Sequence, residues 1–255
     1  MGARKSESAR SFCARVWARL LSFSKNHGLL EPGDIVLARI SGGPDSVCLL
    51  HFLKNMEHRW GLVVVACHVH HGLRGASADR DERFVENLCG KLRVPLFSAK
   101  VKAREHARTH GLSIEHAARQ LRYESFLACA RKIGAHKVAV GHHLDDQVET
   151  VLLHLLRGSS PAGLAGMPMK RALRKNLEKP LLVRPLMCLS RREVLEYIKN
   201  NKLSYVHDES NESEYHTRSW LRKKLLPLME KRQPQLRRHI LALSGNIAKL
   251  IGGRC

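Results

Sequence analysis

The sequence lacks three features that would place a protein in a membrane or outside the cell. Its seven cysteines show no paired spacing, and several lie in apolar runs where a thiol packs as a small hydrophobic group. No run of about 18 apolar residues is present to cross a bilayer. No apolar segment is followed by the small-residue cleavage site of a signal peptide. We therefore expect a protein of the reducing cytoplasm that does not bind a membrane.

Acidic residues are also scarce, with 23 Asp and Glu against 44 Lys and Arg and a formal net charge of +21. A surplus of this size exceeds what solubility requires and attracts polyanions, so nucleic acid is the leading partner class. Residues 156–255 hold 21 of the basic residues and only 8 of the acidic ones, and this half is the better candidate for gripping RNA. A generally basic proteome would give the same sign without any such partner.

Short apolar runs alternate with segments of helical periodicity along the chain. The runs suited to buried strands are 35–40, which includes the awkward charge of Arg39, then 62–69, 94–97 and 137–140. The helical segments are 10–28, 46–56, 79–92, 115–133 and 145–156. This alternation predicts an α/β protein with a Rossmann-like parallel sheet and helices on both faces, because parallel strands need crossover connections. Ligands are expected at the carboxyl ends of the strands.

A glycine-rich loop followed by a basic stretch indicates a domain boundary near residue 170. We expect residues 1–170 to form the α/β domain, with the helix 10–28 packed on it. Residues 171–255 are expected to form a small, basic and mainly helical subdomain. One helix of this subdomain is marked by Ser190 and Glu193, whose spacing is that of a capping box.

A tight turn follows the first predicted strand at once and precedes a helix. Its residues are Ser41, Gly42, Gly43, Pro44, Asp45 and Ser46. Paired glycines let the main chain approach a phosphate closely, and the helix N-terminus adds N–H donors. No lysine follows the glycines, so this is not the loop built to cleave between β- and γ-phosphates. A carboxylate beside phosphates calls for a divalent cation, so Asp45 indicates Mg²⁺, whereas an ordinary turn is the alternative.

Acids and histidines follow the ends of two other predicted strands. Asp146 and Glu149 are three residues apart, hence on one helix face and able to converge on one cation. Arg122 on the preceding helix is the expected counter-charge. His71 and Arg74 are further candidates for contacting a nucleotide, although Arg74 could instead pair with a nearby acid. A zinc site at the histidine pairs is disfavoured, because no Cys-x-x-Cys and no suitably placed His-x-x-x-His accompanies them.

Four ordered motifs together resemble a known family. The strand followed by SGGPDS at 41–46 is similar to the pyrophosphate-binding loop of the PP-loop ATP pyrophosphatases. The motifs HVHHGLR at 68–74, EHAARQLRY at 115–123 and GHHLDDQVET at 141–150 narrow the resemblance to the tRNA(Ile)-lysidine synthase branch. The resemblance covers roughly residues 29–228 and implies the adenine nucleotide alpha hydrolase-like fold.

The resemblance also implies an activity, cofactors and partners. It implies a ligase that joins the ε-amine of free L-lysine to carbon 2 of the wobble cytidine in tRNA(Ile) with a CAU anticodon. ATP would activate the base as an adenylate, leaving AMP and pyrophosphate, and the codon read would change from AUG to AUA. The implied catalytic residues are Asp45, Arg122, Asp146 and Glu149, the last three also binding lysine. The implied cofactors are ATP, held by residues 41–46 with His71 and Arg74, and Mg²⁺, held by Asp45. A homodimer is left open.

Basic residues of the second half are suited to tracking RNA phosphates, which position RNA without reading its sequence. They are Arg171, Arg174, Arg191, Arg192, Arg222, Lys223 and Lys224. The segment RSWLR at 218–222 departs from the R-N-x-[IL]-R pattern of the family at Ser219 and Trp220. Core packing is the expected use of Trp220.

Two other functions share these features. A PP-loop tRNA thiolase uses the same adenylation but delivers sulfur through cysteines or an iron–sulfur cluster, and such enzymes tend to carry a Cys-x-x-Cys that this chain lacks. A tRNA-binding module that keeps the fold without catalysis would show the same charge. Replacement of the cysteines should abolish the activity of a thiolase but not that of a lysine ligase. Replacement of Asp45 should abolish the turnover of a ligase but leave the RNA binding of an inactive module nearly unchanged.

Overall fold

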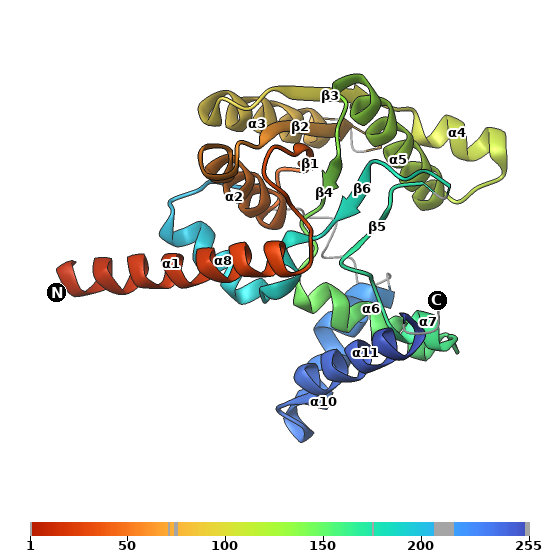
Figure 1. The fold of residues 1–255 in the computed structure, drawn as a ribbon. Coiled ribbons are helices and arrows are strands. Elements are labelled where there is room, and N and C mark those ends of the chain that lie inside the picture. Colours follow the sequence, from red (N-terminus) through yellow and green to blue (C-terminus); the bar gives the residue numbers. More distant parts are fainter. Residues whose placement is uncertain (1, 71, 74–75, 175, 207–216, 253–255) are drawn as a thin grey trace.

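The computed structural model describes residues 2–70, 72–73, 76–174, 176–206 and 217–252. Its centre is a six-stranded sheet in the order β3-β2-β1-β4-β6-β5 (Figure 1). All neighbouring strands are parallel except β5 and β6, so one antiparallel strand closes an edge of the sheet. The strands are β1 (Ile35–Arg39), β2 (Val63–His70), β3 (Leu96–Lys100), β4 (Lys137–Ala139), β5 (Lys170–Ala172) and β6 (Leu181–Val183).

Side chains of the central strand β1 alternate between two cores. Val36 and Ala38 lie in the first core, which contains residues of α1, α2, α3 and α8. Leu37 lies in the second core with Phe126 of α5. Both faces of the sheet are covered, which explains why the strand is apolar at successive positions. The helices of this unit are α1 (Gly2–Asn26), α2 (Pro44–Trp60), α3 (Ala76–Leu92), α4 (Ala103–His110), α5 (Ile114–Ile133), η1 (Pro185–Cys188) and α8 (Arg191–Asn200).

The predicted fold class is confirmed, as are the four predicted strands. The helix expected at 10–28 begins earlier, at Gly2, and ends at Asn26, and it packs on the α/β unit through Val16 and Leu20. The strands β5 and β6 were not predicted, because β5 contains Lys170 and Arg171 and no helix separates it from β6, so neither strand fits the alternation of apolar run and helix. None of the described helices is both long and apolar enough to span a bilayer.

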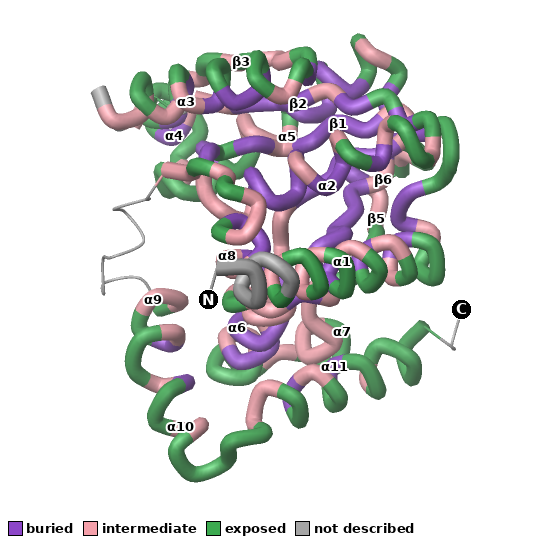
Figure 2. The backbone as a smooth tube through the Cα atoms, turned by 90° about the vertical axis from the view of Figure 1, so that its left-hand side faces the viewer, coloured by how far each residue is buried: buried purple, intermediate pink, exposed green. Residues whose placement is uncertain are grey.

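A group of helices lies beside the sheet at the end of the molecule that carries the C-terminus (Figure 1). Its small core joins Val148, Val151 and Leu152 of α6 to Leu221 and Ile240 from the last part of the chain. Outside this core, α10 and α11 are largely exposed, whereas β1, β4, β6 and α2 are largely buried (Figure 2). The elements of this helical unit are α6 (Leu144–Leu156), α7 (Pro161–Leu164), α9 (Thr217–Trp220), η3 (Leu221–Leu225), α10 (Leu226–Arg232) and α11 (Leu236–Gly252).

The domain boundary expected at residue 170 lies inside β5, at the edge of the sheet. Residues 171–200 beyond it complete the α/β unit, since β6 pairs with β4 and α8 packs on α1 and α2. Conversely, α6 precedes the boundary but forms part of the core of the helical unit. Each of the two units therefore contains segments from both sides of residue 170. The glycine-rich loop that suggested a boundary connects the helical unit to the α/β unit.

Candidate functional site

The turn predicted to bind phosphate lies at the carboxyl end of β1, next to the end of β4. A Cβ atom placed on Gly141 would lie 2.9 Å from the backbone carbon and oxygen of Asp45, closer than real side chains pack. Only a glycine therefore allows the end of β4 to touch the first turn of α2. This contact brings residues 141–149 beside the turn, as expected for ligand-binding residues at strand ends.

The turn itself is held by hydrogen bonds from its two serines. The Ser46 hydroxyl accepts from the Ser41 amide at 3.2 Å and donates to the Gly43 carbonyl at 2.8 Å. Gly42 has a φ of +85°, a left-handed conformation that favours glycine, and its carbonyl accepts from the Val206 amide at 2.9 Å. No side chain in the described structure caps α2, whose first turn therefore directs uncapped N–H groups out of the helix.

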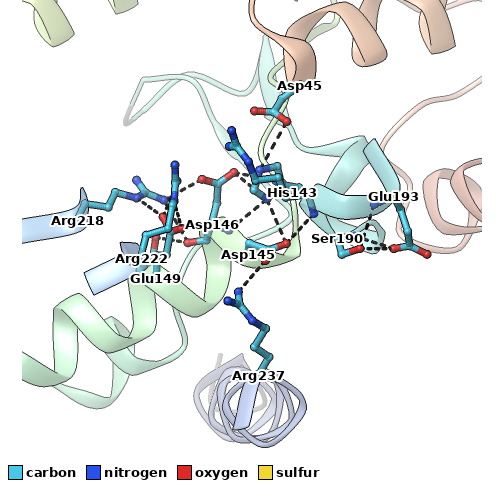
Figure 3. A network of polar contacts seen from close by, with 12 residues as sticks. Asp45, His143, Asp145, Asp146, Glu149, Ser190, Glu193, Arg218, Arg222 and Arg237 are labelled. Carbon is cyan, nitrogen blue, oxygen red and sulfur yellow. Dashed lines mark hydrogen bonds and ion pairs between the residues drawn. The ribbon is translucent and has the colours of Figure 1, made fainter. Parts of the chain in front are cut away.

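Asp45 stands at the first turn of α2 with one carboxylate oxygen, Oδ1, buried and without a hydrogen-bond partner among the described residues. The Nε2 atom of His143 approaches this oxygen at 3.6 Å (Figure 3). Burial raises the pKa of Asp45, and the nearby His143 opposes that rise. An orphaned carboxylate oxygen beside a phosphate-binding turn fits a hard divalent cation as its missing partner.

His143 caps the helix that carries the other acids. Its Nδ1 accepts from the Asp146 amide at 3.3 Å, while the Asp146 carboxylate accepts from the His143 amide at 3.0 Å. Because Nδ1 is an acceptor, the neutral imidazole carries its hydrogen on Nε2, which faces Asp45. Sequence reasoning missed this capping role, because histidine is an unusual residue at a helix start.

Asp146 and Glu149 lie on one face of α6, as their spacing predicts, and both carboxylates form ion pairs with arginines (Figure 3). Arg218 contacts both carboxylates, at 3.0 Å to Asp146 and 2.7 Å to Glu149. Arg222 donates twice to Glu149, at 2.6 and 3.0 Å. Burial opposes ionisation of Glu149, which is 1% exposed, but the two arginines outweigh burial and lower its pKa.

Asp145 has a different role from that of its neighbour. Its carboxylate accepts from the Arg191 amide, at the start of α8, and pairs with Arg237 of α11, each at 2.7 Å. Arg237 also pairs with Glu230 of α10. Asp145 thus fastens the helical unit to the α/β unit through the N-terminus of α8, while its pair with Arg237 holds α11 to α6 within the helical unit.

The structure separates Arg122 from the two acids with which it was expected to act. Among the described residues it contacts neither Asp146 nor Glu149, and its buried Nε has no hydrogen-bond partner. It lines a cavity of about 270 Å³ that also touches Ser41 and His68. That cavity adjoins the phosphate turn and is the candidate nucleotide pocket. His71 and Arg74 lie outside the described residues.

The residues expected to bind RNA are distributed over both units. Arg174 and Arg192 are exposed, as are Lys223 and Lys224. The guanidinium of Arg222 pairs with Glu149, and its role in RNA binding stays a prediction. Trp220 is 42% exposed, which overturns the expectation that it packs in the core.

Sequence reasoning missed a second cavity, of about 420 Å³, which is also lined by Arg122. It is lined by arginines from seven places in the chain, among them the awkward Arg39 of β1 and the buried Arg184 that follows β6. The distances in sequence between these arginines are too irregular to form a motif. Only the charge of Arg39 within an otherwise apolar strand offered a signal.

The fold and the turn define an α/β nucleotide-binding domain whose phosphate loop lacks the lysine of the common ATPase loop. The chain belongs to the PP-loop domain family, whose model matches residues 14–229. The family resemblance drawn from the four motifs is thereby confirmed.

Curated relatives and solved structures agree with this assignment. The tRNA(Ile)-lysidine synthase of Oceanobacillus iheyensis is 37% identical over 217 residues, which are 85% of this chain and 46% of the relative. That of Bacteroides thetaiotaomicron is 36% identical over 90% of this chain and 51% of the relative. The chain thus spans about half the length of these relatives. The U34-tRNA thiolase NcsA from Methanococcus maripaludis, with its [4Fe-4S] cluster, has the same fold at a TM-score of 0.74 and 18% identity, over 94% of this chain and 79% of the thiolase.

Proposed function

We propose that this protein is a tRNA(Ile)-lysidine synthase. The observation that carries the proposal is the meeting of an uncapped phosphate turn, an orphaned oxygen of Asp45 and the acidic pair on α6 at one sheet edge. Curated relatives of this name share 35–38% identity over most of the chain. The relatives are about twice as long, so their activity and partners are carried over only as a proposal.

The first step is activation of the RNA base by ATP. The turn at 41–46 binds the pyrophosphate portion of ATP, and oxygen 2 of the wobble cytidine attacks the α-phosphate, so that pyrophosphate leaves. Asp45 is the residue that would hold Mg²⁺, which supplies charge neutralisation between the phosphates. The protein contributes positioning and electrostatic stabilisation rather than covalent chemistry. His143 lies with Nε2 3.6 Å from the Asp45 carboxylate and opposes the rise in the pKa of that group.

The second step is attack by lysine. The ε-amine displaces AMP at carbon 2 of the base, because an adenylate is a far better leaving group than a carbonyl oxygen. Asp146 and Glu149 hold the second, charged amine of lysine. Since Arg218 and Arg222 neutralise both carboxylates in the structure, the incoming ammonium must share or replace an arginine partner.

The thiolase alternative is disfavoured by the state of the cysteines. Sulfur transfer needs a reactive thiolate, yet burial raises the pKa of Cys89 and of Cys188 to about 11. Burial also raises the pKa of Cys48, in the helix that follows the phosphate turn. Cys129 is the exception, because a hydrogen bond with Cys67 lowers its pKa, but its side chain is fully buried. No group of potential metal ligands among the described residues contains a cysteine. A likeness to the thiolase at 18% identity shows the fold alone.

The proposal is tested by incubating the protein with ATP, lysine and a tRNA(Ile) transcript, then digesting the RNA for nucleoside mass spectrometry. Lysidine should form only when all three are present, with AMP and pyrophosphate released in equal amounts. A variant with Ala or Ser at every cysteine should retain the reaction, whereas a thiolase would lose it. Release of pyrophosphate without lysidine, with each amino acid tried in turn, would reject this substrate pair.

A further inference from the structure

The 420 Å³ cavity is lined by positive charge without acidic compensation. Arg39, Arg119 and Arg122 line one part of it, from β1 and α5. Arginines at positions 157, 171, 184 and 218 complete the lining, and no Asp or Glu is found among the described lining residues. Six of these arginines have no acidic partner among the described residues. Their like charges repel each other, and an anionic ligand is the simplest means of offsetting that repulsion.

The arginines of this cavity are held by neutral groups. Arg184 donates to His142 Nδ1 at 3.0 Å and to the Pro168 carbonyl at 2.6 Å. The ring of Tyr123 lies 5.4 Å from the guanidinium carbons of both Arg119 and Arg171. Such contacts fix the orientation of a guanidinium without cancelling its charge.

Only one of the seven arginines has acidic partners in the described structure, namely Arg218, which pairs with Asp146 and Glu149. Burial, together with the neighbouring Arg122, lowers the pKa of Arg39 to about 10. Burial and the surrounding arginines lower the pKa of His142 to about 2, so this histidine stays neutral. The cavity is therefore a preorganised field of donors, including the buried and unpartnered Nε of Arg122.

The cavity also lies between the two halves of the proposed reaction. It shares Arg39, Arg122 and Phe126 with the candidate nucleotide pocket. At its other side it reaches Thr150, the residue after Glu149, and Arg218. A ligand bound here would touch the approaches to both the phosphate turn and the acidic pair.

We propose that this arginine cavity binds phosphodiester groups of the RNA strand that carries the target base, an inference that rests on the proposed function. A lone carboxylate, such as that of lysine, is satisfied by a single bidentate arginine. Seven arginines and a volume of about 420 Å³ instead match more than one phosphate of a nucleotide chain. The RNA is thus bound mainly by the α/β unit, and not by the basic residues of the C-terminal half alone.

The test uses the full chain with Arg119→Gln and Arg171→Gln, measured against Arg131→Gln. Arg131 is exposed in the last turn of α5, outside the cavity lining, and its loss removes the same charge. Binding of a fluorescent tRNA(Ile) anticodon stem-loop is followed by anisotropy over a salt series. Each cavity variant should bind roughly tenfold more weakly at about 0.15 M salt, and the slope of log Kd against log salt should fall by about one. Arg131→Gln should change neither quantity beyond twofold.

Further measurements separate the proposal from its rivals. The KM for lysine should stay unchanged in both cavity variants, and Arg119→Lys should keep the salt slope because it keeps the charge. A raised KM for lysine with intact RNA binding would show that the cavity holds the amino acid's carboxylate, and would overturn the proposal. RNA affinity equal to that of the Arg131 control in both variants would also overturn it. Loss of RNA binding in the cavity variants, in a protein that forms no lysidine, would support the cavity assignment while rejecting the proposed reaction.

Discussion

The phosphate turn and the arginine cavity lie at the same edge of the sheet but are built in opposite ways. The turn comes from six consecutive residues, and its serines, glycines and helix start determine its shape locally. The cavity draws its arginines from β1, α5, β5 and other elements that meet only in the folded chain. A site made of consecutive residues can be predicted from the sequence, whereas a cluster of charges that the fold brings together from distant segments cannot. The proposed ATP site thus depends on six consecutive residues, and the proposed RNA site depends on the whole fold.

The largest expected effect comes from Asp45→Ala, which breaks the turn's chemistry and leaves the cavity intact. Loss of the carboxylate removes the residue proposed to hold Mg²⁺ between the phosphates, so lysidine formation should fall by roughly a thousandfold or more. RNA affinity should change less than twofold, measured by anisotropy. If turnover survives in Asp45→Ala, the turn does not act as proposed. If turnover is undetectable in the parent protein as well, the chain is a binding module.

The close contact between Gly141, after β4, and the first turn of α2 offers a second way to disturb the phosphate turn without changing the arginine cavity. Gly141→Ala places a Cβ 2.9 Å from the backbone of Asp45, so the turn must shift at a cost of about 1–3 kcal/mol in the free energy of unfolding. The KM for ATP should rise together with this loss, whereas RNA affinity should not change. Gly90→Ala in α3 is the matched control, since nothing lies within 4 Å of its added Cβ and helical propensity improves. Denaturant unfolding and ATP titration measure both effects, and equal stability of the two variants would contradict the close contact.

Much of the fold could be predicted from the sequence, and the reasons for the failures are physical. The strands at 35–40 and 137–140 were visible because burial on both faces demands consecutive apolar residues. The acidic pair was visible because a separation of three residues places Asp146 and Glu149 on one helix face. By contrast, the pairing of these acids with Arg218 and Arg222 depends on a helix some 70 positions away, which no periodicity announces. The domain boundary at residue 170 stays a prediction, but the sequence could not show that α6 packs with helices at the opposite end of the sequence.

That long-range pairing predicts a defect confined to the helical unit. Glu149→Gln removes a buried carboxylate and leaves two guanidinium groups without their charged partner, so docking of α9–α11 on α6 should weaken by about 2 kcal/mol. Hydrogen exchange should accelerate in α10 and α11 and stay unchanged in β1 and α2. Glu124→Gln on α5 is a matched control at an exposed glutamate. Equal acceleration throughout the sheet would show that the two units do not separate energetically.

The smallest expected effect is the pH dependence of the same docking. The arginines hold the pKa of Glu149 below its ordinary value of 4.5, so their stabilisation is fully present above about pH 4.5. It is lost as the pH falls through the lowered pKa of the folded protein, because protonation removes the charge that Arg218 and Arg222 share. Hydrogen exchange of α10 and α11 between pH 6 and pH 3, corrected for intrinsic rates, should therefore show a loss of protection below about pH 4.5 that Glu149→Gln lacks. Asp45 shifts in the other direction, because burial raises its pKa, and it lies on α2 in the α/β unit rather than on the helical unit. An acid loss of protection that persists in Glu149→Gln would show that the loss does not come from the pairs of Glu149 with Arg218 and Arg222.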